Sequence, residues 1–167
     1  MANKHQVQII LEQPESWPKA HNMILEKVDL SFRSNMSEKA RASEVRCTYR
    51  VLKYDLAENN YFHEKYSKRE IATIFKTRGE LLRINYRPHI NQENELCTLC
   101  NLREREDTLH FLAVCPILKE IRVAHFSKAK LTLDEAKEVL NGQDWRALAG
   151  YVTEALKYRN MIIDELF

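Results

Sequence analysis

Three cysteines and a histidine in the second half of the chain have the residue types and the spacing of a metal-ligand set. Cys97 and Cys100 are separated by two residues, and His110 and Cys115 follow in a second segment. Two thiolates from a Cys-x-x-Cys turn, an imidazole and a third thiolate make up the four ligands of a tetrahedral Zn²⁺ site. Because four protein ligands leave no open position, the pattern predicts a structural zinc site.

The segment from His110 to Cys115 must turn before both side chains can reach one ion. In a continuous α-helix they would point about 140° apart. Pro116 disfavours helical geometry at Cys115, so we expect the chain to turn there and Pro116 to open a new helix. The positive end of that helix would favour the ionised form of the Cys115 thiol. Asp107 is expected to cap a short helix that carries His110.

Two other interpretations of the cysteines stay open. Free cysteine is among the most buried residue types, so these side chains could pack in a core without a metal. A disulfide is the second, but three clustered cysteines leave one unpaired. The polar N-terminus, whose apolar run over residues 7–11 is too short for a signal sequence, favours a reducing intracellular compartment, nuclear or cytoplasmic. Cys47 lies fifty residues upstream of Cys97 and is expected to be a core residue.

The composition predicts a mainly α fold, and together with the ligand set it predicts a helical domain with an embedded structural zinc site. The 167 residues include only three glycines and four prolines, while 30% are charged and 44% are apolar. No apolar run approaches the length of about 18 residues that a membrane span needs, so no membrane association is expected. The size suits one compact domain in four segments. These are an N-terminal segment over 1–35, a basic helical region over 36–87, the zinc segment over 88–126 and C-terminal helices over 127–167.

Helical periodicity and capping signals predict where the helices lie. The expected helices cover about 21–32, 45–56, 67–84, 117–126, 132–141 and 144–167. Ser67 and Thr132 each open a capping box, and Asp144 is expected to cap the last helix. The helix after Ser67 is expected to place Phe75 on its apolar face and to tolerate Gly79 in its interior.

The last helix carries a long apolar stripe. Its members are Trp145, Leu148, Ala149, Val152, Leu156, Ile163 and Leu166. Such a stripe is usually part of the core, although a terminal amphipathic helix can also dock onto a protein partner.

Positive charge is concentrated in residues 37–87, which hold twelve Lys/Arg and seven Asp/Glu. A polyanion would meet the chain in this region first, although a basic row is also typical of a solvated helix face. The side chains expected to contact nucleic-acid phosphates are Arg46, Arg50, Lys53, Lys68, Arg69, Arg78, Arg83 and Arg87.

Three motifs occur in one order along this part of the chain. They are Leu81-Leu-Arg-Ile-Asn85, Cys97-Thr-Leu-Cys100, and Glu106-Asp-Thr-Leu-His110-Phe-Leu-Ala-Val-Cys115-Pro116 followed by Arg122. Together they resemble the C-terminal zinc-binding (CCHC) region of non-LTR retrotransposon reverse transcriptases, specifically between residues 78 and 122. The resemblance implies a helical zinc module that follows the polymerase and helps to hold template RNA or target DNA, without catalysis of its own.

Catalytic elements of that family are not evident in the sequence. The chain has no Tyr-x-Asp-Asp turn for two-metal polymerase chemistry. Asp134, Glu135, Glu138 and Asp144 are interpreted as caps and surface charges rather than as the convergent carboxylates of a nuclease. The sequence thus predicts a zinc-stabilised module that binds RNA or DNA and is not an enzyme.

Two alternatives come from other functional classes. The first is a protein-interaction scaffold in which zinc only stabilises the fold and the last helix docks onto the partner. The second is a zinc enzyme with a water in place of one ligand, which four soft protein ligands disfavour.

Overall fold

The chain is mainly helical, as predicted. A computed structural model describes residues 17–43, 46, 48–52, 60–62, 65–88, 90 and 94–166. Among these residues, extended backbone pairs only at an isolated antiparallel bridge between Leu96 and Arg105. The chain divides into two compact units, Met1–Ala42 and Ser43–Phe167. The division into four segments, made from the sequence, remains a prediction. Within the described ranges, no helix combines the length and the apolar character that crossing a membrane would require.

In the first unit, the described residues form one long helix, α2 (Trp17–Arg41). It includes the predicted 21–32 helix and extends beyond it at both ends. Asp29 and Arg33 form an ion pair one turn apart, at 2.7 Å. At helical spacing along α2, four large apolar side chains are exposed: Leu25, Val28, Phe32 and Met36. The helix therefore presents an apolar row, called the α2 row below.

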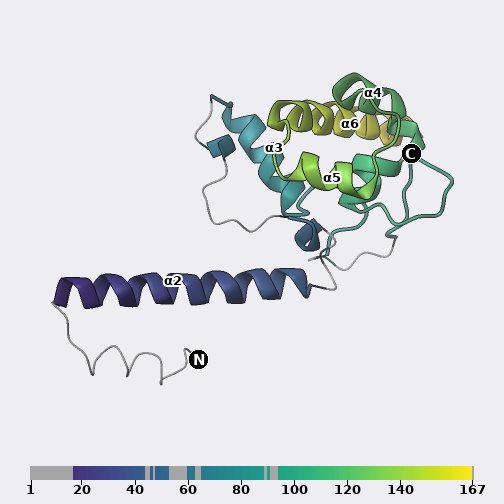
Figure 1. Cartoon of the computed structure of the whole chain (residues 1–167). Coiled ribbons are helices and arrows are strands. Elements are labelled where there is room, and N and C mark those ends of the chain that lie inside the picture. The colour runs from purple at the N-terminus through teal and green to yellow at the C-terminus, as the bar shows by residue number, and fades with distance from the viewer. Residues whose placement is uncertain are drawn as a thin grey trace. The chain divides into compact units, whose positions relative to one another are not determined.

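Helix α6 (Trp145–Leu166) is the central element of the second unit (Figure 1). It packs against α3 (Lys68–Arg78), α4 (Lys119–Phe126) and α5 (Leu133–Leu140). Of the predicted stripe, four members are buried, Leu156 and Ile163 are partly buried, and the Leu166 side chain lies outside the described residues. The buried members are Trp145, Leu148, Ala149 and Val152. The stripe on α6 is therefore part of the core of its own unit.

The predicted caps are confirmed. Ser67 begins α3 with a complete capping box to Glu70, and Thr132 begins α5 with one to Glu135. A carboxylate oxygen of Asp144 accepts hydrogen bonds from the amides of Arg146 and Ala147, both at 2.9 Å, at the start of α6. These side chains satisfy amide groups that the first turn of a helix leaves without partners.

The close of α5 also follows the prediction. Asn141 ends the helix, and Gly142 takes a φ of +99°. A Cβ at Gly142 would lie 2.5 Å from the ring of Trp145, so the position requires glycine for space as well as for conformation.

The predicted extension of α3 to Ile84 is wrong, because the helix ends at Arg78. Gly79 follows as its C-cap, and Glu80 takes a left-handed φ of +54°. The Glu80 carboxylate is buried, where it accepts hydrogen bonds from the amide and the hydroxyl of Thr48, the latter at 2.7 Å. The contact between Thr48 and Glu80 therefore favours a turn after Arg78, although the local sequence pattern favours a continued helix.

The predicted helix over 45–56 is also wrong in its described part. Residues 48–50 form a single 3₁₀ turn, followed by a turn at Val51 and a bend at Leu52. The amide of Thr48 donates to Glu80 instead of to a carbonyl one helical turn earlier. Val45, Cys47 and residues 53–59 lie outside the described residues.

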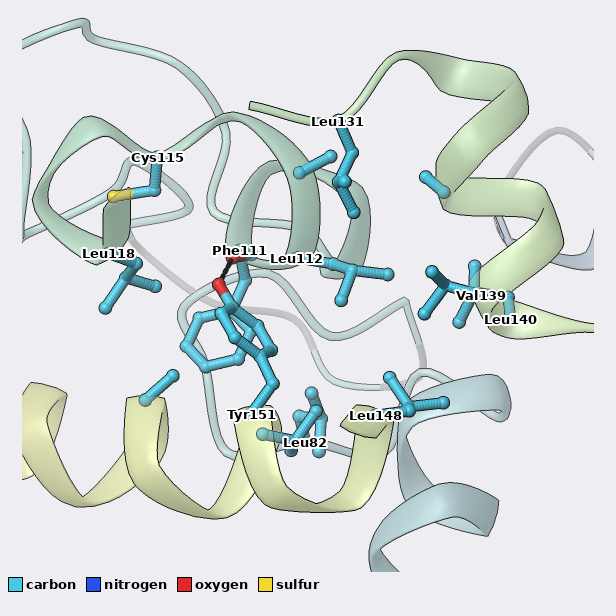
Figure 2. Close-up of a cluster of buried hydrophobic side chains, with 14 of the residues drawn as sticks. Leu82, Phe111, Leu112, Cys115, Leu118, Leu131, Val139, Leu140, Leu148 and Tyr151 are labelled. Carbon is cyan, nitrogen blue, oxygen red and sulfur yellow. Dashed lines mark hydrogen bonds between the residues drawn. The ribbon is translucent and has the colours of Figure 1, made fainter. Parts of the chain in front are cut away.

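The core of the second unit joins the metal-ligand segment to α5 and α6 (Figure 2). Phe111 and Leu112 belong to the same buried cluster as Leu140 of α5 and Leu148 of α6. The Tyr151 hydroxyl of α6 donates a hydrogen bond to the carbonyl oxygen of Phe111 at 2.6 Å. The segment that carries two predicted ligands is therefore built into the core.

Candidate metal centre

The four predicted ligand residues come together in one buried cluster. Their donor atoms all lie within 4.8 Å of one another. The Sγ atoms of Cys97 and Cys115 are 4.0 Å apart, and the Cys100 Sγ lies 3.5 Å from the His110 Nε2. A tetrahedron with metal–sulfur distances of about 2.3 Å has edges of about 3.8 Å. The cluster therefore has the donor set and the dimensions to hold one metal ion.

A short hairpin-like segment positions the first two cysteines. The amide of Cys97 donates to the carbonyl of Glu104 at 2.9 Å, and the amide of Glu106 donates to the carbonyl of Glu95 at 2.8 Å. Cys97 lies at the end of the first paired segment and Cys100 lies in the turn that follows, and both sulfurs belong to the same cluster. This is the turn that the Cys-x-x-Cys spacing predicted.

A π-helix over His110–Val114 positions the other two ligands. It closes with a hydrogen bond from the Cys115 amide to the His110 carbonyl at 2.9 Å, which spans five residues. The turn is wider than an α-turn, so Cys115 returns toward His110 instead of pointing away. Asp107 accepts a hydrogen bond from the His110 amide at 2.7 Å, which confirms the predicted cap.

Pro116 has the predicted role, but it does not act alone. Cys115 leaves helical geometry with a ψ of 118°, and Pro116 opens the 3₁₀-helix Pro116–Leu118, which continues into α4. Sequence reasoning assigned the whole reorientation of Cys115 to the proline and missed the π-helix. A five-residue apolar segment carries no periodicity that separates the two helix types.

Buried polar side chains donate hydrogen bonds to carbonyl groups of the π-helix and of Cys115, which follows it. Arg122, which is fully buried, donates from Nε to the Leu112 carbonyl at 2.8 Å and from Nη2 to the Cys115 carbonyl at 2.9 Å. The bond from Tyr151 satisfies Phe111 in the same way. The sequence marks Arg122 only as the last residue of the motif, whereas the structure shows that it holds the backbone beside Cys115.

Glu104 orients the histidine. Its carboxylate lies 2.9 Å from Nδ1 of His110, while Nε2 faces the cysteines. A carboxylate that accepts a hydrogen bond from Nδ1–H fixes the tautomer in which the Nε2 lone pair is available to a metal. This pair has the arrangement found behind metal-bound histidines.

Burial and hydrogen bonds shift the pKa values of the three thiols in different directions. A hydrogen bond from the Cys97 thiol lowers the pKa of Cys115, and backbone amides of Ile117 and Leu118 add to the effect. That same bond, together with burial, raises the pKa of Cys97 to about 12, while burial raises the pKa of Cys100. A bound cation would supply the positive charge that stabilises all three thiolates.

The pKa of His110 is also shifted. Burial lowers it, but the hydrogen bonds and charges of Cys97 and Glu104 outweigh burial and raise it overall.

A buried ion pair lies next to the cluster. Both carboxylate oxygens of Glu106 accept from the Arg159 guanidinium of α6, at 2.8 and 2.7 Å, and the Asn85 amide donates to Glu106 at 2.8 Å. Glu106 Oε1 lies 3.9 Å from the Cys97 Sγ. Sequence reasoning missed this pair. The sequence does contain a sign of it. Arg159 lies four residues after Ala155 and three after Leu156, so this cation falls on the apolar face of the last helix.

The predicted basic row of Arg46, Arg50 and Lys53 does not lie on one helix. Arg46 Nη1 donates to the Gly79 carbonyl at 3.1 Å, and Arg50 Nε donates to the Ser43 carbonyl at 2.6 Å. Lys53 lies outside the described residues. Both described arginines therefore take part in contacts within their own unit.

The other predicted cations lie on or after α3. Lys68, Arg69 and Arg83 are exposed, and Arg78 and Arg87 are half-buried. The Arg78 guanidinium lies 5.3 Å from the centre of the Trp145 ring. This geometry is that of a cation–π contact, so Arg78 packs at the α3–α6 junction.

Replacing Glu104 with alanine should weaken zinc binding by about 10- to 100-fold, because His110 loses the carboxylate that orients its ring. A competition titration with a chromogenic chelator measures this affinity. Glu154→Ala is the matched control, since Glu154 forms the same kind of pair with His125 at 2.9 Å, away from the predicted ligands. Equal losses in the two variants would contradict the role assigned to Glu104.

Comparison of the chain with protein families, with curated proteins and with solved structures found no match in any of the three.

Proposed function

We propose that the chain is a zinc-stabilised module that binds nucleic acid and catalyses no reaction of its own. Its relation to the C-terminal region of non-LTR retrotransposon reverse transcriptases is part of this proposal. The observation that carries it is the buried cluster of Cys97, Cys100, His110 and Cys115. Further support comes from two motif residues beside the cluster. Glu106 pairs with Arg159, and Arg122 donates to the carbonyl of Cys115.

Zinc is the metal that this donor set fits best. Three thiolates and one imidazole are soft and borderline ligands, which disfavour Mg²⁺ and Ca²⁺. Tetrahedral sites of three cysteines and one histidine are typical of structural zinc. Because all four positions come from the protein, the metal would stabilise the fold and would not activate water.

Surface charge supports the nucleic-acid part of the proposal. The exposed cations Lys68, Arg69 and Arg83 lie on and just after α3. Among the described residues, none of these three cations forms an ion pair, whereas Lys128 pairs with Glu135 and Lys137 pairs with Asp134. Phosphate contacts by the α3 cations would give an electrostatic, sequence-independent affinity.

A salt titration tests this proposal. Affinity for RNA and DNA strands should fall with salt, with a log–log slope of about −0.7 to −0.9 for each phosphate contact. The triple variant Lys68→Ala, Arg69→Ala, Arg83→Ala should weaken binding to all sequences and reduce the slope by about two to three units. Fluorescence anisotropy at several salt concentrations measures both quantities, and the strands should stay intact with Mg²⁺ present.

The matched control removes three other lysines of the second unit, by Lys119→Ala, Lys128→Ala and Lys137→Ala. Each of these lysines forms an ion pair with a neighbouring acid, so the variant should bind as the wild type does. Equal loss in both triple variants would show that binding depends on net charge alone and would reject the α3 site.

The second candidate function is a protein-interaction scaffold. The α6 stripe is used by the core of its own unit, so this alternative now depends on the exposed α2 row. A helix with an apolar row of this kind can bury it in the groove of a partner. A chain that binds neither RNA nor DNA at low salt would favour this candidate.

A further inference from the structure

One aromatic residue of α3 does not lie where its sequence pattern predicts. Phe75 was expected on the buried face, yet it is 53% exposed, whereas Ile74 and Thr77 of the same helix are fully buried. A single exposed apolar residue on a protein surface is ordinary. Whether the Phe75 ring belongs to a binding surface depends on the side chains that surround it on the helix.

Cations flank Phe75 on the exposed face of α3. At 100° per residue, Lys68, Ala72 and Phe75 follow one another along this face, and Arg69 and Lys76 lie beside them. All five are exposed. From the first to the last, the face is about 12 Å long, which is the length of a few stacked nucleotides at about 3.4 Å each.

The acid of this helix is directed elsewhere. Glu70 turns back toward the start of α3, where its carboxylate accepts hydrogen bonds from the amide and the hydroxyl of Ser67 at 2.8 and 2.7 Å. Among the described residues, no acidic side chain forms an ion pair with Lys68, Arg69 or Lys76. The face therefore combines an accessible phenyl ring with cations that form no ion pair within the described part of the chain.

We infer that this face of α3 binds unpaired nucleotides, with a base stacked on Phe75 and phosphates held by Lys68, Arg69 and Lys76. The inference rests on the proposed function and specifies its ligand as single-stranded nucleic acid. Aromatic rings and cations along one groove or face are the usual elements of single-strand binding. The small side chain of Ala72 leaves room for a base beside the ring.

The phenyl ring is what favours a single strand over a duplex. In a duplex, the faces of the bases are covered by their neighbours in the stack, so a ring on a helix surface meets only the backbone. In a single strand, every base offers a free face, and stacking is tolerant of sequence. Cations alone would bind both forms, so a preference for single strands isolates the contribution of Phe75.

A comparison of base-bearing and abasic strands of equal length and charge, with a duplex of the same sequence as the third ligand, tests this inference. Wild-type protein should prefer the base-bearing strand, and Phe75→Ala should weaken its binding by about 5- to 150-fold. The same variant should bind the abasic strand as the wild type does. Phe75→Trp should restore the preference, and Lys76→Ala should weaken both strands equally. Unchanged zinc content in each variant shows that the fold is intact.

Met161→Ala is the matched control. Met161 is 48% exposed on α6, where Asp164 and Glu165 lie one turn further on, so it has an acidic setting. Its removal should leave binding unchanged. If Phe75→Ala binds both strands as the wild type does, or if duplex is preferred, the stacking site is rejected while the proposed function stands. If the wild type binds no nucleic acid at low salt, both are rejected.

Discussion

Cys100→Ser should lose the bound zinc ion and loosen the backbone over residues 90–122. A serine hydroxyl is a poor replacement for a thiolate, and three remaining ligands leave the ion open to solvent. For structural zinc sites, a binding free energy of about 10 to 16 kcal/mol is also folding free energy. Metal analysis of the purified variant measures zinc content, and amide hydrogen exchange locates the loosened segment.

Cys47→Ser is the control for this experiment. Cys47 is not among the predicted ligands, so the variant should keep its zinc. Full zinc occupancy in Cys100→Ser would reject the ligand assignment. Loss of zinc in both variants would show that serine substitution acts through general destabilisation.

Arg159→Met should destabilise the second unit by about 3 to 5 kcal/mol. The substitution keeps the volume of the side chain and leaves the Glu106 carboxylate buried without its counter-charge. That carboxylate also lies close to the Cys97 sulfur, so the negative charges of the site would repel each other more strongly. Denaturant unfolding of the zinc-loaded protein measures the loss.

Two variants separate the ion pair from the rest of α6. The double variant Glu106→Gln, Arg159→Met removes both charges and should recover part of the lost stability. Lys157→Met, at an exposed position of the same helix, should change the free energy of unfolding by no more than about 0.5 kcal/mol. A loss in Arg159→Met no larger than that of Lys157→Met would contradict the role of the pair.

The ligand set and the helix caps were predictable because their signals are local. Cys97 and Cys100 are recognisable as ligands because they are three positions apart. Ser67 and Thr132 are recognisable as caps because each has a glutamate three residues further on. For the Cys-x-x-Cys pair and for each capping box, the residues that define the signal lie within one turn of the chain. No knowledge of the tertiary structure was needed.

The errors fall where a distant residue decides the local conformation. Glu80 ends the α3 region because its carboxylate bonds to Thr48, 32 residues earlier. Arg159 is buried because it pairs with Glu106, 53 residues away. Phe75 has the periodicity of a core residue, and only the packing of α3 against α6 decides that it faces outward. Contacts at such separations leave no trace in local periodicity.

The π-helix suggests how the segment between His110 and Cys115 can tolerate the deletion of one residue. In an α-helical turn, ligands four positions apart would already share a face. Here they are five positions apart, and the additional residue is absorbed by widening one turn, with the apolar side chains from Phe111 to Ala113 still buried. Chains with one residue fewer in this segment can therefore keep the same ligand geometry on an ordinary helical turn. A sequence profile of this module should therefore allow the histidine and the last cysteine to be four or five positions apart. The shorter spacing corresponds to an α-helical turn and the longer one to a π-helical turn.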